Sequence, residues 1–400
     1  MLFRQCNLLD CVCNPVNVLD GVSINQGNSI SIRHIFSDNC NWEVYLVLHR
    51  DGLREVEISE VDKMLSCDEK GYRVFMCPVC GEVRTVFFGC NSRLCTHCGK
   101  SYTDKWAERV ARSTFNVLHR HVVLTIPEDL RKFFLQDRRF LKVLMDCAIK
   151  TLGDVLCWRL KSVATPGVVV VLHTFGKDMK FNPHLHCLVT EGGFKKNGTW
   201  VQLGYFPYEL LRKSWQYQVL TSLKAELEDS YENRRLIDSL FKRYSKGFYV
   251  RAKDTIRNKK GMMKYIGRYI KHPAIAESRI SSYDGKSVCF WHEEDNGTRK
   301  YVSMSVDEFI TAVIRHIPDE QFKTIRHYGV YSRGLKKKFR ALRYMVSIAQ
   351  AKITEFLKSW APKCPKCGTN MQYVCSLEGK PPPKQKFGEK ITDWSHMTTA

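Results

Sequence analysis

Two pairs of closely spaced cysteines are the first residues in the sequence whose spacing predicts chemistry. The segments CPVCG at 77–81 and CTHCG at 95–99 each hold two cysteines three positions apart, followed by a glycine. Glycine lets the backbone turn tightly around a metal ion, and four thiolates satisfy the tetrahedral coordination of Zn²⁺. We therefore expect one structural zinc site with the ligands Cys77, Cys80, Cys95 and Cys98.

Further cysteines leave two questions about zinc open. Cys90 either replaces one of the four expected ligands or packs in the interior, and packing is slightly favoured. A third segment of the same kind, CPKCG at 364–368, supplies Cys364 and Cys367 but has no second pair after it. A second zinc site there would need ligands from elsewhere in the chain. The cysteines available for it are Cys375, Cys6, Cys11 and Cys13.

The segment FNPHLHCLV contains a second candidate site, formed by His184 and His186. Side chains alternate along a strand, so the two imidazoles would share one face while Leu185 and Cys187 point to the other. Taken alone, this pattern is more typical of a partly buried strand than of a metal site. If segment 168–175 pairs with 184–191 as a hairpin, His173 approaches the same place, as a third ligand or as a hydrogen-bonding group behind the ligands. Three nitrogen ligands would leave metal positions open for phosphate oxygens.

Two tyrosines four residues apart favour the catalytic interpretation of these histidines. Tyr265 and Tyr269 would lie on one face of a basic helix that we predict at about 258–271. A free tyrosine, with a pKa of about 10, is a weak nucleophile at neutral pH. Lys264, Arg268 and Lys271 would stabilise its phenolate, and attack on a phosphate would form a phosphotyrosine and release a DNA hydroxyl. Without the histidines, both tyrosines would be interpreted as packing residues.

Positive charge is concentrated in two parts of the chain. The formal net charge is +22, and residues 241–272 hold eleven Lys or Arg against one acidic residue. Residues 323–343 hold eight Lys or Arg and no acidic residue. Aromatic residues lie between these charges, which favours a nucleic-acid partner. The basic residues that we expect to contact DNA are Lys264, Arg268, Lys271, Arg326, Lys336, Lys337 and Lys338.

Helices and strands follow one another without a regular βαβ rhythm, which predicts an α+β fold. We expect strands at 119–127, 167–175, 185–192 and 247–252, a helix at 101–118, one long helix at 128–164 and a helical pair at 207–245. No apolar stretch is long enough to span a membrane and no secretion signal is visible, so we expect a cytoplasmic protein in a reducing environment.

Five segments together resemble the rolling-circle transposases of prokaryotic insertion sequences, which belong to the HUH endonuclease superfamily with two tyrosines. They are CNSRLCTHCGKSYTDKW (90–106), HRHVVLTIPEDLR (119–131), LHTFGKDMKFNPHLHCLVTEGG (172–193), KYIGRYIKHPAIAESRI (264–280) and FKTIRHYGVYSRG (322–334). The resemblance implies that His184 and His186 bind Mg²⁺ or Mn²⁺, that Tyr265 and Tyr269 are the nucleophiles, and that His173 fits a third ligand. It also implies cleavage of single-stranded DNA at element ends, including hairpins or stems, through a 5′-phosphotyrosine in a nucleoid-associated enzyme.

The resemblance also implies a zinc-binding domain, which we place at 71–118, and an HUH domain on a central antiparallel sheet, at 119–290. The sequence patterns predict an N-terminal helical region (1–70), a basic helical region (291–362), and a knuckle-like segment with a disordered tail (363–400). Two alternatives stay open. One is a replication initiator or relaxase with the same chemistry, and the other is a non-catalytic zinc-ribbon protein that binds DNA.

Overall fold

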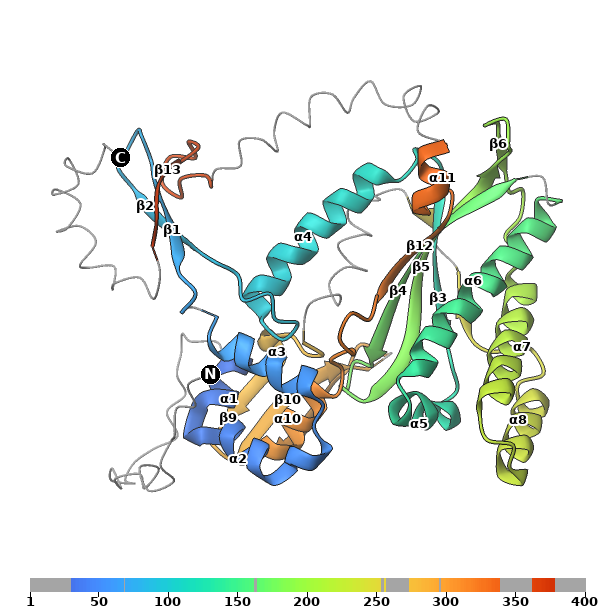
Figure 1. Ribbon diagram of the computed structural model, residues 1–400, viewed down its shortest axis with the longest axis horizontal. Coiled ribbons are helices and arrows are strands. Elements are labelled where there is room, and N and C mark those ends of the chain that lie inside the picture. The colour runs from blue at the N-terminus through green and yellow to red at the C-terminus, as the bar shows by residue number, and fades with distance from the viewer. Residues whose placement is uncertain are drawn as a thin grey trace.

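The computed structural model describes residues 30–67, 69–161, 164–252, 255–256, 273–294, 296–338 and 362–377. Their strands form three separate antiparallel sheets, each with its own set of helices or turns (Figure 1). This arrangement confirms the predicted α+β class with a central antiparallel sheet.

The central sheet carries the histidines. Its strands lie in the order β12 (Ile325–Gly329), β4 (Thr165–Phe175), β5 (Phe181–Phe194), β3 (His119–Thr125) and β7 (Val250–Arg251). Two short strands extend it, because β6 (Trp200–Gln202) pairs with β5 and β8 (Thr255–Ile256) pairs with β3. Strands β4 and β5 form the hairpin that the sequence predicts, with His173 opposite His184.

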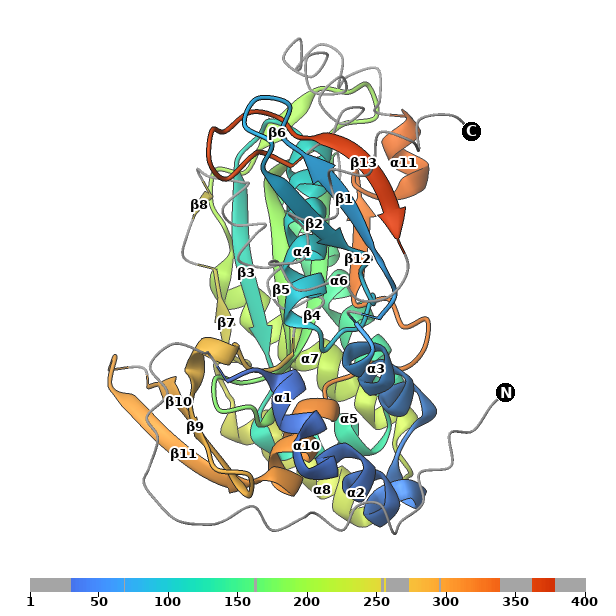
Figure 2. The same cartoon turned by 90° about the vertical axis from the view of Figure 1, so that its left-hand side faces the viewer.

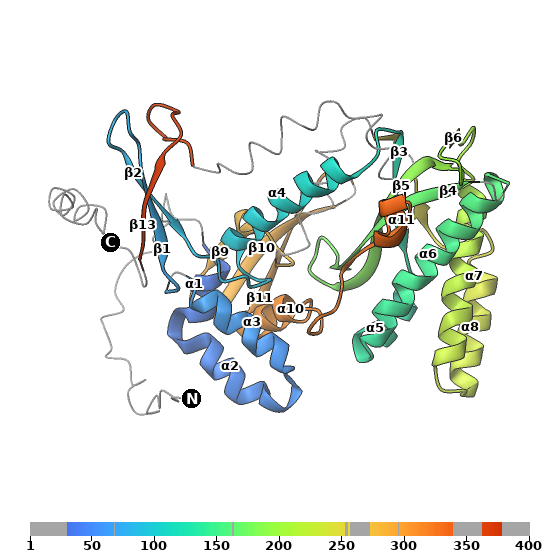
Figure 3. The same cartoon turned by 45° about the horizontal axis from the view of Figure 1, so that its top comes forward.

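Four helices cover one face of this sheet: α5 (Glu128–Gln136), α6 (Arg139–Arg159), α7 (Tyr208–Glu226) and α8 (Tyr231–Arg243) (Figure 3). Alternation along β5 directs Leu185, Cys187 and Val189 into the core beneath them, as expected. Trp215 of α7 is completely buried there, and its indole Nε1 donates to the carbonyl oxygen of Thr125 at 2.7 Å. The histidine-bearing positions of β5 therefore face the opposite side.

Helix α4 (Thr96–Ser113) packs on the histidine-bearing face. Trp106 and Val110 of α4 contact a smaller core that contains Val169 and Val171 of β4. Tyr331, which follows β12, completes this core, and its hydroxyl lies 2.6 Å from Nε2 of the buried His119. α4 therefore covers only part of this face.

A second body combines two parts of the chain that are far apart in sequence. Helices α1 (Ile32–Ser37), α2 (Asn41–His49) and α3 (Glu55–Leu65) share one core with β9 (Ile280–Tyr283), β10 (Ser287–Glu293), β11 (Arg299–Ser305) and α10 (Val306–Ile314) (Figure 1). Three short 3-10 turns, Asp38–Cys40, Arg50–Gly52 and Glu277–Arg279, connect these elements. The expected N-terminal helices are present in the described residues, but they do not form a core alone.

The third sheet is small and lies beyond the start of α4 in Figure 1, so that it stands in front of this helix in Figure 2. It has the order β13 (Gln372–Leu377), β1 (Tyr72–Met76) and β2 (Val83–Phe87). Its strands therefore come from both ends of the described chain.

Two expectations about the elements are wrong. The predicted single helix at 128–164 is two helices, because Asp137 between them has an extended backbone with φ −124° and ψ 104°. The expected helical region at 291–362 contains the end of β10, all of β11 and β12, and two helices, α10 and α11 (Arg333–Lys338), in its described part. β12 belongs to the central sheet, beyond the expected boundary at 290. The predicted helix at 258–271, residues 339–361 and the tail from 378 lie outside the described residues.

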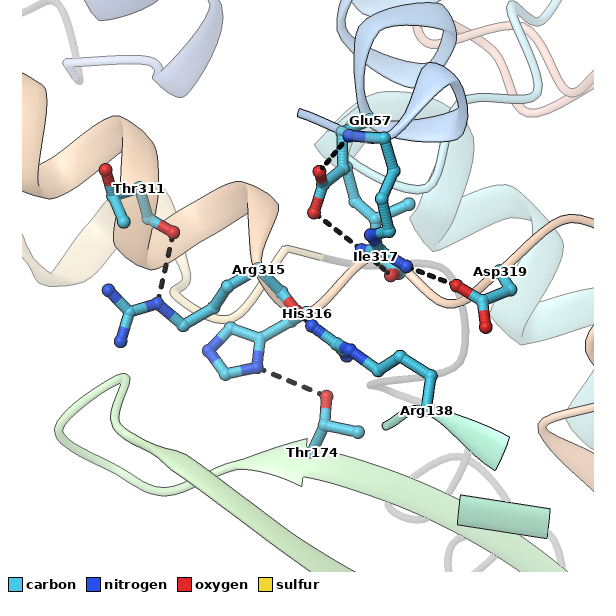
Figure 4. A network of polar contacts seen from close by, with 9 residues as sticks. Glu57, Arg138, Thr174, Thr311, Arg315, His316, Ile317 and Asp319 are labelled. Atoms are coloured by element: carbon cyan, nitrogen blue, oxygen red, sulfur yellow. Dashed lines mark hydrogen bonds and ion pairs between the residues drawn. The ribbon is translucent and has the colours of Figure 1, made fainter. Parts of the chain in front are cut away.

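A polar network joins the second body to the β4–β5 hairpin (Figure 4). His316, at the end of α10, lies with Nδ1 3.2 Å from the hydroxyl of Thr174, and its Nε2 donates to the carbonyl of Met179 at 2.9 Å. Arg138 donates to the carbonyl oxygen of Arg315 across the same junction. In the part of the chain that the structure describes, no helix is long and apolar enough to cross a membrane.

Candidate metal centre and cysteine clusters

The structure brings His173, His184 and His186 together on one face of the β4–β5 hairpin. One ring nitrogen of each lies within 4.8 Å of a ring nitrogen of the other two. The ring centroids of His173 and His186 are 4.2 Å apart, and those of His184 and His186 are 5.0 Å apart. Within the described residues, no carboxylate or cysteine joins this group. Three imidazoles at these distances can hold one metal ion.

Hydrogen bonds set which nitrogen of each imidazole is available. Nδ1 of His184 donates to the backbone carbonyl of Asn182 at 2.8 Å, which leaves its Nε2 lone pair free. Nδ1 of His186 lies 2.8 Å from Nε2 of His121 on the neighbouring strand β3. With the proton on Nδ1 of His186, its Nε2 is the nitrogen that carries the lone pair for a metal ion.

Burial favours the neutral form of His184 and His186. The pKa of His184 is lowered by its removal from water, and the nearby Arg131 adds to this effect. The pKa of His186 lies well below its usual value because of burial and because three other histidines surround it. Neutral imidazole is the form that binds metal.

His121 is a residue of this site that our sequence analysis did not assign. It lies on β3, where its position is opposite Leu188, two residues beyond His186 on the same face of β5. Its ring stacks on that of His186 with centroids 5.1 Å apart. The segment HRHVV contains the signal, because His119 and His121 must share one face of a strand. The signal becomes specific only when the pairing of β3 with β5 is known.

Positive charge lies beside the histidines. A small cavity of about 40 Å³ at the junction with the second body is lined by His173, Arg93 and Arg138, among others. Nη1 of Arg138 is buried and has no hydrogen-bond partner among the described residues. Burial and the neighbouring Arg54 lower the pKa of Arg138 to about 10, which still leaves its guanidinium charged at neutral pH.

Several predicted functional residues cannot be placed in this geometry. Tyr265 and Tyr269 lie outside the described residues, as do the basic residues Lys264, Arg268 and Lys271. Arg326 lies on β12 and forms an ion pair with Asp146 of α6 at 2.7 Å, so it links the sheet to a helix. Residues Lys336, Lys337 and Lys338 end helix α11.

The expected grouping of cysteines into one zinc site is wrong. Cys95 and Cys98, at the start of α4, cluster with Cys67 and Cys90. The sulfur of Cys67 lies 3.6 Å from each of those of Cys95 and Cys98, and the sulfurs of Cys90 and Cys98 are 3.7 Å apart. Cys90 therefore lies within this group, where packing had been slightly favoured.

Cys77 and Cys80 belong to a different cluster, in the third sheet, together with Cys364 and Cys367. The pairs 77–80 and 95–98 separate because strands β1 and β2 carry the first pair away from α4 (Figure 1). The chain therefore contains two groups of four cysteines where one had been expected. Close sulfur neighbours lower the pKa of Cys98, and contacts with Thr369 lower that of Cys367 to about 6.

Comparison with known proteins identifies the family. Residues 39–126 match the family described as "Transposase zinc-binding domain", and residues 167–338 match the family described as "Putative transposase". The chain is 27% identical over 383 residues to the transposase for insertion sequence element IS801 of Pseudomonas savastanoi pv. phaseolicola, an alignment that covers 87% of this chain and 90% of that protein. This chain belongs to the insertion-sequence transposases.

A second relative supports this assignment. The transposase is 29% identical over 277 residues to the "Putative transposase y4qJ" of Sinorhizobium fredii, covering 65% of this chain and 70% of that one. No solved structure matches the transposase. The zinc-binding match includes all four cysteines of the first cluster, whereas Cys364 and Cys367 lie beyond both matches. The three clustered histidines fall within the second match.

Proposed function

We propose that this transposase cuts and rejoins single-stranded DNA at the ends of an insertion sequence, through a 5′-phosphotyrosine formed by Tyr265 or Tyr269. The cluster of His173, His184 and His186 is the observation that carries the proposal. Three imidazoles whose ring nitrogens lie within 4.8 Å of one another, beside the positive charge of Arg138, suit a metal ion and the phosphate that it would hold.

The described ends of segment 257–272 support the assignment of the tyrosines. Before this segment, Ile256 pairs with His119 at one end of β3. After it, Pro273 lines the same cavity as His173, near the other end. Along β3, the six residue steps from His119 to Thr125, which lies opposite His184, span about 20 Å. Tyr265 and Tyr269 lie in the sequence between these two points, and we propose that one of them reaches the histidines.

The protein residues have defined roles in the proposed reaction. The phenolate oxygen of the tyrosine attacks the scissile phosphorus, and the bond from phosphorus to the 3′ oxygen breaks. The products are a tyrosine–5′-phosphate bond and a free 3′ hydroxyl, which takes a proton. Attack of a DNA 3′ hydroxyl on the same phosphorus reverses the step, restores the tyrosine and joins a new strand. Because one phosphodiester replaces another, no external energy source is needed.

A divalent metal ion, when bound, would polarise the scissile phosphate and stabilise negative charge on its oxygens. His173, His184 and His186 would hold this ion, and His121 would fix the ring of His186. Three nitrogen donors without a carboxylate suit Mn²⁺ better than Mg²⁺, which prefers oxygen ligands. Arg131 and Arg138 would attract the phosphate backbone through their charge.

The first cysteine cluster has a separate role in this proposal. Cys67, Cys90, Cys95 and Cys98 would bind one structural Zn²⁺ that joins the end of α3 to the start of α4. Cys67, Cys90 and Cys95 are buried within the core of the second body, as is usual for a structural site with four protein ligands.

The decisive experiment is to detect a covalent protein–DNA adduct. The full-length transposase is incubated with Mn²⁺ or Mg²⁺ and with labelled single-stranded DNA of the element ends, and the products are separated on a denaturing gel. We expect an adduct with the wild type and none with the Tyr265→Phe, Tyr269→Phe double variant. Tyr301→Phe is the matched control, because Tyr301 is an exposed tyrosine on β11, and this variant should form the adduct normally.

Replacement of His184 and His186 by alanine tests the metal centre. We expect the adduct to disappear while filter binding of the same DNA is retained, because the basic surfaces are unchanged. An adduct that persists in the double tyrosine variant would show that the nucleophile is another residue. An adduct of normal yield in the double histidine variant would show that these histidines only support the fold.

A further inference from the structure

The segments around Cys77 and Cys364 have the same backbone conformation. In each segment, a glycine follows four residues after the first cysteine, and its N–H donates to the carbonyl of that cysteine at 3.0 Å. The donors are Gly81 and Gly368. In each, the N–H of the first cysteine donates at 2.8 Å to the carbonyl of the residue five positions later. Gly81 and Gly368 both adopt left-handed conformations, with φ values of 69° and 74°. The two segments are therefore equivalent metal-binding turns.

The segment CTHCG at 95–99 is built differently, although its cysteine spacing is the same. It begins helix α4, so that Gly99 lies within the first turns of the helix and donates to the carbonyl of Cys95 at 2.9 Å. The structural partner of the turn at 77–81 is therefore the turn at 364–368, with which it also shares a proline after the first cysteine.

The two equivalent turns place their sulfurs against each other. The sulfur of Cys77 lies 3.4 Å from that of Cys367, and the sulfur of Cys80 lies 3.4 Å from that of Cys364 and 3.7 Å from that of Cys367. Lys366 and Glu82 form an ion pair between the turns at 2.6 Å. Spacing of this kind between four sulfurs is that of a tetrahedral thiolate site.

The sheet around these turns has too little apolar core to be stable without a further link. Its buried core consists of Phe75, Cys77, Cys364 and Met371, with Val86 partly buried beside them. Its strands have five, five and six residues, and β13 joins only through its pairing with β1. A sheet of this size needs a metal ion or a covalent link to hold its strands together.

We propose that Cys77, Cys80, Cys364 and Cys367 bind a second Zn²⁺, and that this ion closes the transposase chain into a loop. The paired cysteines Cys80 and Cys364 are 284 residues apart in sequence. The loop between them contains the histidine site, the whole central sheet and three members of the first cysteine cluster, Cys90, Cys95 and Cys98. Zinc binding at this site fixes residues 362–377 to the N-terminal zinc-binding domain.

The pairing of the cysteines is tested by cobalt substitution of the full-length protein. Co²⁺ bound to four thiolates gives a strong sulfur-to-cobalt charge-transfer band, to which a three-histidine site contributes nothing. We expect Cys364→Ser with Cys367→Ser to halve this band, as Cys77→Ser with Cys80→Ser does. All four replacements together should still leave half of the band, because they remove one site. Cys375→Ser is the matched control, since Cys375 lies on β13 outside the cluster, and the band should stay whole.

Two results would overturn the proposal. One is an unchanged band in the Cys364→Ser, Cys367→Ser variant. The other is a half-sized band when Cys77→Ser and Cys80→Ser are combined with Cys95→Ser and Cys98→Ser, since our proposal requires that combination to abolish the band. The variant Cys367→His covers the case in which the serine variants do not fold, because imidazole also binds Zn²⁺ and Cys367 is exposed. We expect this variant to bind Co²⁺ with a shifted visible spectrum, and an unshifted spectrum would exclude Cys367 as a ligand.

Discussion

His316 should make the transposase sensitive to mild acid, because it is buried at the junction between the second body and the catalytic hairpin. In its neutral form, Nδ1 of His316 accepts from the hydroxyl of Thr174 (Figure 4). Its Nε2–H donates to the carbonyl of Met179. Burial lowers the pKa of His316 to about 3, and the nearby Arg315 and Arg138 add to the decrease. The folded protein therefore cannot accept a proton here at moderately acidic pH.

The sign and size of the effect follow from proton linkage. The unfolded chain takes up a proton at His316 below pH of about 6.5, whereas the folded chain stays neutral down to a pH of about 3. The free energy of unfolding therefore falls as the pH falls below 6.5. Between pH 8 and pH 5.5, His316 alone should remove about 1.4 kcal/mol, which is RT ln(1 + 10). Because pH 5.5 lies far above the pKa of His316 in the folded chain, the predicted change in the free energy of unfolding depends only on the pKa of His316 in the unfolded chain.

The assay compares urea denaturation of the wild type and His316→Gln at pH 8 and pH 5.5, followed by tryptophan fluorescence. Glutamine can donate to Met179 but does not titrate, so the loss of stability between the two pH values should be about 1.4 kcal/mol smaller in the variant. Other buried histidines contribute equally to both proteins and cancel. His292→Gln, at a partly buried position on β10, is the control and should behave as the wild type. An equal loss in His316→Gln and the wild type would refute the reasoning.

Further predictions concern the metal centre, the sheet and DNA binding. His121→Ala should weaken Mn²⁺ binding 10- to 100-fold by calorimetry, and His121→Gln, whose amide oxygen still accepts from His186, should restore most of it. Gly329→Ala should cost at least about 2 kcal/mol in urea denaturation, because its φ is 58° and a Cβ would lie 1.8 Å from the carbonyl oxygen of Pro166. Trp215→Ala should cost about 3–5 kcal/mol in the same assay. Titrations at several salt concentrations should give a log–log slope of about −4 for single-stranded DNA, from about six phosphate contacts once Arg326 is left out because of its ion pair with Asp146. A slope near zero would exclude the predicted basic residues.

The sequence predicts the histidine site well because its signal is local. Alternation places His184 and His186 on one face, and a short turn forces β4 to pair with β5, which brings in His173. His121 was missed because its contact with His186 depends on the register of a strand more than 60 residues earlier. Local patterns carry no information about such a register.

The cysteine clusters show the opposite situation. The spacing of two residues within a pair is local, but the choice of partner pair depends on the path of the whole chain. Cys77 and Cys80 were paired with the next similar segment, whereas the fold brings them to Cys364 and Cys367. The proline and the left-handed glycine common to both turns are better guides than the nearness of the segments in sequence.

The boundary expected at residue 290 was wrong for a related reason. The chain leaves the central sheet after β8, builds half of the second body, and returns to add β12 beside β4. The prediction of a single helix at 128–164 was wrong for a local reason. The apolar periodicity of α5 continues almost unbroken into α6, and Asp137 is the break between them.

The late return of β12 has a consequence for the synthesis of the protein. While the ribosome makes the chain, β4 is completed at residue 175, and β12 begins at residue 325. At about 5–20 residues per second, the nascent chain waits about 8–30 s for this partner. During that time the valine-rich β4 has one edge with unpaired backbone groups, which is the kind of edge that joins other chains into aggregates. Chaperones that bind the nascent chain at this stage would cover this edge. The supply of such chaperones should therefore limit how much active transposase a cell can make.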